Sequence, residues 1–358
     1  MNVTEMTSSS NSSDTKLGIE RTCFLISLWT VPLICIIGFV GNSMSIKIFV
    51  GKTQRTTSCC VYLATKAVSD NGFLLTLLIA WLDFVDIRAF HIEGICQITL
   101  FFSYLCGFMS AWAVVFVTIE NYIRVCCPEK VSSYCTPKFA RNITITCFFS
   151  ACIIYSFPLW GTQISVLQGV TFCQTNPEFQ KLQLALTYVD SLLTLVLPLL
   201  IVPVLVVKTV YSSQEASQRS FRLQHCQSAV TRKRISPHRA VTRLLLTVAL
   251  VFVFLHTPSH VIRIKVTIEE LMKKVQTVSV VDRVLQHLFL TLYHLNYAVN
   301  IFIYICCGRR FRTVLYSRLR QLSTKENSQK DRDKASIEEL IRISHSFLVG
   351  SEHIETKL

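Results

Sequence analysis

The chain has 358 residues, long enough for two soluble domains, yet only 16% of them are charged and 51% are hydrophobic. A soluble domain has about 25% charged residues, and its helices keep a polar face. The apolar residues occur instead in long blocks, and the block 192–207 contains Thr194 as its single polar side chain. This composition argues against a large soluble helical bundle.

Seven of these apolar blocks are long enough to cross a membrane, which requires about 20 mostly apolar residues in each helix. They lie at 24–50, 60–83, 93–127, 139–163, 183–211, 241–266 and 284–306. We therefore predict an all-α fold, a bundle of seven transmembrane helices. The predicted domains are an N-terminal segment 1–23, a seven-helix domain 24–312 and a tail 313–358.

The basic residues indicate the orientation of the bundle. The connection 208–243 contains eight lysines and arginines and a single acid, Glu215. Positively charged loops stay in the cytoplasm, so we expect an extracellular N-terminus and a cytoplasmic tail. The net charge of +14 is then mostly cytoplasmic. Such a surface is attracted to the anionic lipids of the inner leaflet, and we do not expect nucleic-acid binding.

Several residues are candidates for covalent modification in this orientation. Asn2 and Asn11 begin glycosylation triplets on the extracellular side, whereas Asn142 begins a third triplet at the inner membrane edge and should stay unmodified. Cys306 and Cys307 lie where the last helix leaves the membrane. Palmitoylation is plausible there, and unmodified cysteines at the membrane edge fit equally well.

Most of the 15 cysteines lie inside predicted helices or on the reducing cytoplasmic side, which argues against a disulfide framework. Three of them face outward, namely Cys23, Cys96 and Cys173. Cys96 opens the third helix and Cys173 lies in the loop before the fifth, so we expect these two to pair.

A few polar side chains occur inside the apolar blocks. Asp70 lies midway along the second helix, where an ionisable group is costly without a partner or a cavity. The neighbouring helices supply neutral polar groups, at Asn42, Ser110, Asn296 and Asn300. A carboxylate with several neutral oxygen donors suits a small hard cation or a proton. A purely structural hydrogen-bond network between the helices is the alternative.

Short motifs occur in a fixed order along these helices. They are Gly41-Asn42, Leu63-Ala64 with Ser69-Asp70, Ser110-Ala111-Trp112, Glu120-Asn121-Tyr122, Phe252 with Pro258, Asn300 to Tyr304, and Gly308 to Arg312. In this order and spacing the chain resembles the rhodopsin-like (class A) G-protein-coupled receptors over about residues 24–312. The segments 258–263 and 295–300 are similar to those of invertebrate neuropeptide receptors.

The resemblance implies a receptor of the plasma membrane and not an enzyme, with heterotrimeric G proteins and arrestin as intracellular partners. It implies a short amphipathic eighth helix from Gly308 and an outer disulfide between Cys96 and Cys173. It also favours a sodium or proton site over a structural network, with Asp70 as the sodium ligand. The remaining members of that polar network are Asn42, Ser110, Asn296 and Asn300.

The resemblance assigns activation to seven residues: Glu120, Asn121, Tyr122, Phe252, His256, Pro258 and Tyr304. Three departures from the family pattern bear on it. Asn121 replaces the arginine of D/E-R-Y, and Arg124, one turn onward, is not expected to substitute for it. His256 replaces the usual tryptophan of the sixth helix, and Ile301 replaces the proline of N-P-x-x-Y.

The ligand class follows partly by exclusion. Ser103 stands where receptors for amines have an aspartate, and His294 stands where opsins have the lysine that forms a Schiff base. The groups expected around the outer cavity mix aromatic, charged and hydrogen-bonding side chains, which suits a peptide. We expect this ligand pocket to contain Trp81, Gln97, Ser103, Tyr104, Asp190, His260, Arg263, Gln286, Tyr293 and His294.

Two alternatives remain open from the sequence. Asn121 motivates an arrestin-selective or scavenging receptor with weak G-protein coupling. A seven-helix transporter or channel would need an internal repeat or paired charges along a path through the membrane, and the sequence has neither.

His256 and His260 have the spacing of a two-histidine metal site but no evident third ligand, so we interpret them as polar groups of the pocket.

Overall fold

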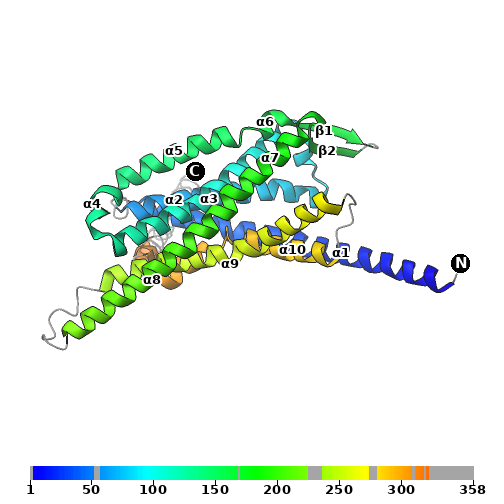
Figure 1. Ribbon diagram of the computed structural model, residues 1–358. Helices are drawn as coiled ribbons and strands as arrows, with labels where there is room; N and C mark the ends of the chain where they lie inside the picture. Colours follow the sequence, from blue (N-terminus) through cyan, green and yellow to red (C-terminus); the bar gives the residue numbers. More distant parts are fainter. Residues whose placement is uncertain are drawn as a thin grey trace, which may run out of the picture. The chain divides into compact units, whose positions relative to one another are not determined.

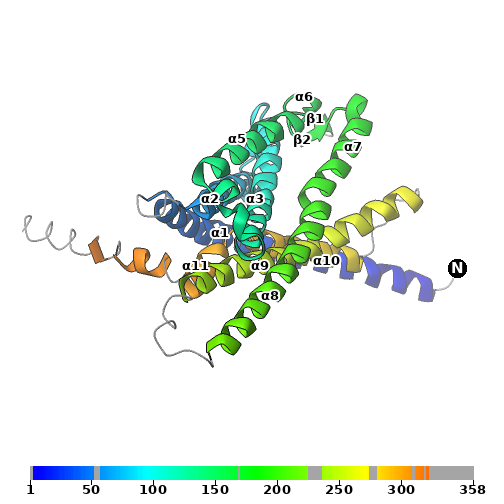
Figure 2. The same cartoon turned by 60° about the vertical axis from the view of Figure 1, so that its left-hand side comes forward.

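The computed structural model describes residues 3–51, 57–167, 170–224, 236–273, 280–308, 311–317 and 320–321. Contacts divide the chain into two compact units, Met1–Gly308 and Arg309–Leu358, which are described separately below. The first unit is the helical bundle of Figures 1 and 2.

Six helical segments of the bundle are long and apolar enough to cross a membrane, and a bent pair of helices makes the seventh span. This confirms the predicted seven-helix fold. The six spans are Arg21–Phe49, Ser58–Val85, Ile95–Cys126, Pro137–Gly161, Pro177–Glu215 and Val241–Ile262, and the bent pair is Val284–Leu295 with Asn300–Cys307.

The spans are built from longer and shorter helices (Figure 1). The long ones are α1 (Val3–Phe49), α2 (Ser58–Trp81), α3 (Ile95–Cys126), α5 (Pro137–Ile154), α7 (Gln180–Ser191), α8 (Leu197–Gln224), α9 (Ser236–Lys273), α10 (Val280–Leu295) and α11 (Asn300–Cys307). Short turns of helix join them: α4 (Val131–Tyr134), α6 (Pro158–Gly161), η1 (Leu82–Val85), η2 (Ala89–His91), η3 (Pro128–Lys130), η4 (Pro177–Phe179) and the π-helical turn η5 (Leu192–Val196).

One element departs from the all-α prediction. The loop before the fifth span contains an antiparallel hairpin of β1 (Thr162–Leu167) and β2 (Val170–Thr175), which lies next to α6 in Figure 1. Ile164 pairs with Cys173 in this register, so the predicted disulfide cysteine is held on a strand and not on an irregular loop.

α3 lies at the centre of the bundle, because it packs against α2, α5, α8 and α9. Its buried side chains include small ones such as Gly107, Ser110 and Ala113, which allow neighbouring helices to come close. α3 therefore places polar side chains in the interior of the bundle, among them Ser110 and Glu120.

The seventh span bends by 51° between its two helices, although residues 280–307 contain no proline. At the break, the backbone N–H groups of Tyr297 and Ala298 donate three residues back, to His294 and Leu295. The carbonyl of Tyr297 accepts instead from the Asn42 side-chain amide of α1, at 2.9 Å. Gly41 allows this approach, because a Cβ atom there would lie 2.7 Å from the Ile301 side chain.

The fifth span contains a widened turn at η5, where the N–H of Leu197 donates five residues back to the carbonyl of Leu192. Pro198 follows directly and has no N–H with which to continue the regular helical pattern. Pro203 and Pro258 lie inside α8 and α9, where each lacks the N–H of a regular helical residue.

The two ends of the chain extend beyond the spans. α1 begins at Val3, so the predicted boundary after residue 23 falls inside a continuous helix. Asn2 and the side chain of Asn11 lie outside the described residues. In the second unit, residues 311–317 are helical, as expected for the eighth helix, and Phe311 and Leu315 share one helix face. The tail beyond residue 321 is also outside the described residues.

Candidate functional site

A polar cavity of about 300 Å³ opens between α2, α3, the fifth span, α9 and α10. The structure brings seven of the ten predicted pocket residues to its wall: Ser103, Tyr104, Asp190, His260, Gln286, Tyr293 and His294. Sequence reasoning missed the other lining residues: Phe73, Leu100, Gly107, Phe108, Thr194, Ser259 and Leu290. The cavity is at the small end of the range for ligand pockets, about 300–1,000 Å³.

Asp190 is the acidic residue of this wall, and its side chain is buried. The Tyr155 hydroxyl donates a hydrogen bond to its Oδ1 atom at 3.0 Å. Tyr155 in turn stacks on Tyr104, with ring centroids 5.8 Å apart. The Tyr155 hydroxyl thus helps to orient the carboxylate, which is the acidic group of the cavity wall.

Aromatic rings connect the cavity with the bundle interior. His256, buried one turn below His260 on α9, lies 4.1 Å from the ring of Phe252 and 4.9 Å from that of Tyr293. The Tyr297 hydroxyl donates to the Tyr293 hydroxyl at 2.6 Å. His256 therefore packs where the tryptophan of the resemblance was expected. Among the described residues, no three side chains are grouped as metal ligands.

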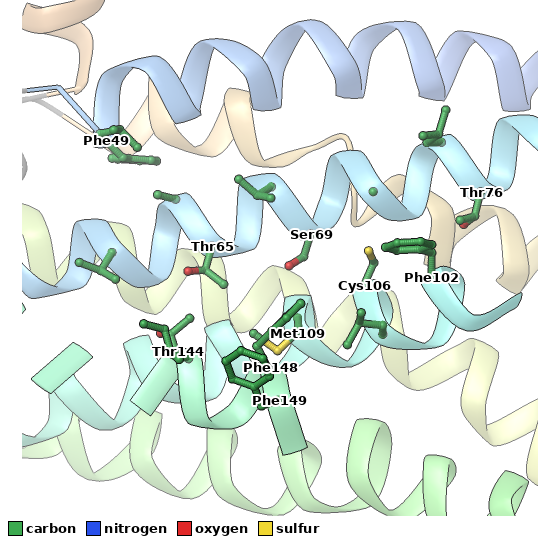
Figure 3. Close-up of a pocket in the computed structure, with 18 of the residues that line it drawn as sticks. Phe49, Thr65, Ser69, Thr76, Phe102, Cys106, Met109, Thr144, Phe148 and Phe149 are labelled. Atoms are coloured by element: carbon green, nitrogen blue, oxygen red, sulfur yellow. The ribbon is translucent and has the colours of Figure 1, made fainter. Parts of the chain in front are cut away.

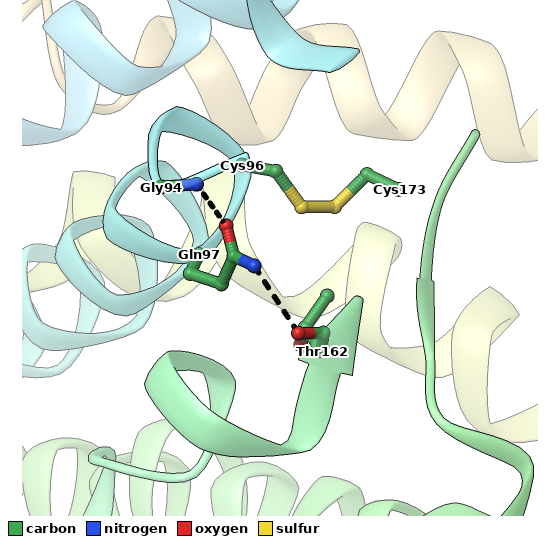
Figure 4. The surroundings of a disulfide bond; sticks show 5 residues. All are labelled: Gly94, Cys96, Gln97, Thr162 and Cys173. Atoms are coloured by element: carbon green, nitrogen blue, oxygen red, sulfur yellow. Dashed lines mark hydrogen bonds between the residues drawn. A yellow bond between two sulfur atoms is a disulfide. The ribbon is translucent and has the colours of Figure 1, made fainter. Parts of the chain in front are cut away.

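Two of the other three predicted pocket residues, Trp81 and Gln97, do not line the cavity. The indole N–H of Trp81 donates to the Leu28 carbonyl at 3.1 Å, which ties α2 to α1. Gln97 accepts from the Gly94 N–H at 2.7 Å and donates to the Thr162 carbonyl at 3.2 Å (Figure 4), so its role is structural. The side chain of Arg263 lies outside the described residues.

The disulfide end of the bundle is held by the bond between Cys96 and Cys173, as predicted (Figure 4). Gly94, just before α3, has a φ of +85°, a backbone conformation that favours glycine. The Gln97 bonds and the disulfide together fix the start of α3 against the hairpin. These contacts position the end of α3 that carries Ser103 and Tyr104.

The predicted polar network contains a member that the sequence analysis overlooked. Lys66, four residues before Asp70 on α2, is 1% exposed, and its Nζ atom lies 3.2 and 3.0 Å from the two carboxylate oxygens of Asp70. The same Nζ atom donates to the Ser110 hydroxyl at 3.0 Å. The position expected for a sodium ion next to Asp70 is thus filled by a side-chain ammonium.

The rest of the network is divided between two places. Ser110 and Asn300 donate directly to Asp70, at 2.5 and 2.8 Å. Asn42 bonds to the backbone of Tyr297 instead, and Asn296 contributes its carbonyl to Asn300 at 3.0 Å. Of the five predicted members, therefore, three form the direct Asp70 cluster and two support the bend of the seventh span.

A second charge cluster lies near the C-terminal end of α3, away from the disulfide. Arg124 donates to Oε1 of Glu120 from its Nε and terminal nitrogens, at 2.9 and 2.6 Å. Ser58, the first residue of α2, donates to the same Glu120 oxygen at 2.7 Å and accepts from Arg124 at 2.9 Å. The expectation that Arg124 would not substitute for the missing arginine is wrong for this ion pair: a step of four residues brings it onto Glu120.

The other residues assigned to activation lie on three helices of the bundle. Asn121, Phe252 and Tyr304 are buried, and Tyr122 is half-buried beside them on α3. Tyr304 packs edge-on against Phe49 of α1, with ring centroids 5.2 Å apart. The activation residues thus lie on α3, α9 and α11, in contact with the interior of the bundle.

A larger groove of about 1,390 Å³ lies between α2, α3 and α5 (Figure 3). Phe102, Met109, Phe148 and Phe149 line it, and Arg141 is its single charged lining residue. Its other hydrogen-bonding groups are hydroxyls and thiols, so it lacks the combination of carboxylate, imidazole and amide groups that lines the smaller cavity. The smaller polar cavity is therefore the better candidate for the ligand site.

Comparison with known families gives one match. Residues 41–304 match the family model of the seven-transmembrane receptors of the rhodopsin family, which covers well over half of the chain.

Proposed function

The chain belongs to the rhodopsin (class A) family of seven-transmembrane receptors, and from that premise we propose that it is a plasma-membrane receptor for a peptide, most closely of the neuropeptide kind. Membership makes it a multi-pass membrane receptor and not an enzyme, and it implies coupling to heterotrimeric G proteins. The basic connection 208–243 supports an extracellular N-terminus. Arrestin binding, glycosylation of Asn2 and Asn11, and palmitoylation of Cys306 and Cys307 are part of the proposal.

The polar cavity is the observation that carries the peptide proposal. It combines a buried carboxylate, Asp190, with the hydrogen-bonding groups of Gln286 and His260 and with aromatic rings. Its volume of about 300 Å³ fits one end of a peptide, not a whole one. Asp190 complements a positive charge, so we propose that a basic side chain or the terminal ammonium of the peptide enters the cavity.

A screen tests this proposal directly. The surface-tagged receptor is exposed to a panel of neuropeptides while G-protein dissociation and arrestin recruitment are followed in parallel. We expect at least one peptide with a basic end to dissociate the G protein. If a well-expressed receptor responds to no peptide but does respond to a lipid or amine panel, the peptide proposal is wrong.

The role of Asp190 gives a sharper prediction. Replacing Asp190 with asparagine removes the charge and keeps the shape, and a charge-assisted hydrogen bond contributes about 1.5–3 kcal/mol. We therefore expect the potency of an activating peptide to fall by about 10- to 100-fold in the concentration–response curve. The matched control is Glu178→Gln, an exposed acid on η4 outside the cavity, which should leave potency unchanged. Equal potencies for both variants would exclude Asp190 as the ionic contact.

The Glu120 cluster supports G-protein coupling despite Asn121. Arg124 supplies a guanidinium one turn further along α3, and the cluster ties α3 to the start of α2 through Ser58. The ion pair lies within α3, and the Ser58 hydroxyl of α2 bonds to both of its members, so the cluster favours receptor states in which these two helices keep this arrangement. We propose that this cluster stabilises the inactive arrangement.

Neutralising this cluster should raise signalling without ligand. Glu120→Gln removes the buried charge that Arg124 pairs with, and a change of about 1.5 kcal/mol shifts a two-state equilibrium about tenfold. We expect ligand-independent G-protein dissociation to increase several-fold at equal surface expression. Glu129→Gln, an exposed acid on η3, is the matched control and should not change it.

The arrestin-selective alternative predicts a different pattern. If Asn121 has removed coupling, Glu120→Gln stays silent in the G-protein assay, whereas Asn121→Arg creates a signal that the parent lacks. A parent receptor that already activates a G protein argues against this alternative.

A further inference from the structure

Asp70 and Lys66 form a buried ion pair on α2, inside the bundle. The carboxylate is 0% exposed and receives four contacts, two from Lys66 and one each from Ser110 and Asn300. A carboxylate has about four lone-pair directions, so these contacts use all of its acceptor capacity. The oxygens that a cation would need are already engaged.

The ammonium of Lys66 is matched to its surroundings in the same way. It has three N–H donors, and its contacts are the two Asp70 oxygens and the Ser110 hydroxyl. Ser110 accepts from Lys66 and donates to Asp70, which satisfies the hydroxyl in both directions. The cluster is closed, because the hydrogen-bonding groups of Lys66 and Asp70 all find their partners among Lys66, Asp70, Ser110 and Asn300.

A sodium ion does not fit this donor set. Hard cations bind oxygen ligands, whereas here a cationic nitrogen, Nζ of Lys66, already contacts both oxygens of the carboxylate. The pair Lys66–Asp70 has no net charge, so an additional cation would meet the like charge of the ammonium and no uncompensated carboxylate. Helix spacing explains the arrangement, because residues four apart on α2 lie on one face.

We propose that Lys66 is a covalently attached replacement for the mobile cation of this site, so that the receptor's stability and conformational equilibrium do not respond to sodium. The cation cannot dissociate from Asp70 into solvent, since it is part of α2. The arrangement of the cluster changes only when the helices that carry Lys66, Ser110 and Asn300 move relative to one another. This inference goes beyond the proposed function and needs no ligand for its test.

The experiment measures thermal unfolding of the full-length receptor in detergent, in sodium chloride and in potassium chloride at equal ionic strength. For the parent we expect the two Tm values to agree to within about 1 °C. For Lys66→Met, which frees the carboxylate and keeps a side chain of similar length, we expect sodium to raise Tm by about 5 °C, the size of shift that a bound ligand gives. The double variant Lys66→Met/Asp70→Asn, without the carboxylate, should lose this sodium effect.

The parent measurement alone can overturn the proposal. A Tm of the parent that rises with sodium but not with potassium would show that an ion binds in spite of Lys66. A folded Lys66→Met variant that is indifferent to sodium would show that the lysine does not occupy a latent cation site. If Lys66→Met does not fold, Lys66→Gln is used in the same comparison. None of these readings depends on a peptide or a G protein, so failure here is distinct from failure of the proposed function.

Discussion

The variant Asp70→Asn will be less stable than the parent by about 3–5 kcal/mol, because it leaves the Lys66 ammonium buried and without its counter-charge. Removing one partner of a buried ion pair is far more costly than replacing both partners with neutral groups of similar size. The double variant Lys66→Met/Asp70→Asn should therefore recover much of the loss. Thermal unfolding of purified receptor measures both variants.

A surface ion pair provides the matched control. Asp86 lies 3.7 Å from Arg88, and the two side chains are 91% and 55% exposed. Exposed pairs of this kind contribute at most about 1 kcal/mol, so Asp86→Asn should change stability little. If Asp70→Asn were as stable as Asp86→Asn, the central ion pair would not be a structural element of the bundle.

Removing the disulfide is the second change with a large expected effect. Cys96→Ser or Cys173→Ser should cost about 2–5 kcal/mol, since the bond closes a loop across 77 residues of sequence separation. The start of α3 and the hairpin would lose their covalent connection, and the cavity wall at Ser103 and Tyr104 depends on that end of α3. We expect low surface expression and loss of peptide response.

Two comparisons make the disulfide prediction specific. The double variant Cys96→Ser/Cys173→Ser should be no worse than either single variant, because both changes break the same bond. Cys23→Ser alters the third outward cysteine of the sequence, which is free in the structure, and should retain parent expression, as measured by flow cytometry of a surface tag. A defect of Cys23→Ser equal to that of Cys96→Ser would point to a different pairing.

The seven spans could be predicted from the sequence because an apolar block of this length has few alternatives to a membrane helix. The hairpin was missed, although its signal is present: β-branched residues such as Ile164, Val166 and Val170 flank Gly169 between two predicted spans. The all-α prediction contained no strands, so it did not include this hairpin in the loop before the fifth span.

The two charge clusters show that ion pairs within one helix can be predicted from the sequence, whereas contacts between helices cannot. Lys66–Asp70 and Glu120–Arg124 are both separated by four residues on one helix, so the pairing rule for helix faces makes both pairs predictable, although neither was predicted. Their third partners, Ser110 and Ser58, come from another helix, and sequence spacing contains no information on such contacts. Lys66 was not among the predicted members of the polar network, although the same spacing of four residues places it on the helix face of Asp70.

The sequence predicted the types of side chain that line the ligand cavity, but not all of the residues that line it. Asp190, His260 and Tyr293 reach its wall as expected, because each lies in the outer half of a predicted span. Trp81 and Gln97 were chosen for the same reason, yet their polar atoms are engaged with Leu28, Gly94 and Thr162. The sequence indicates how deep in the membrane a side chain lies, but it does not show to which backbone group that side chain is hydrogen-bonded.

The bend of the seventh span has a consequence for the conformational equilibrium of this receptor. A proline would make the break permanent, because its ring lacks the N–H of a straight helix. Here every residue from 296 to 299 retains that N–H, and the 51° angle is maintained by contacts with Asn42 of α1 and, through Asn300, with Asp70 of α2. The angle can therefore change reversibly. An event that rearranges α1 or α2 at these contacts changes the free-energy difference between a bent and a straight seventh span, and straightening the span affects the Lys66 cluster with the same coupling free energy.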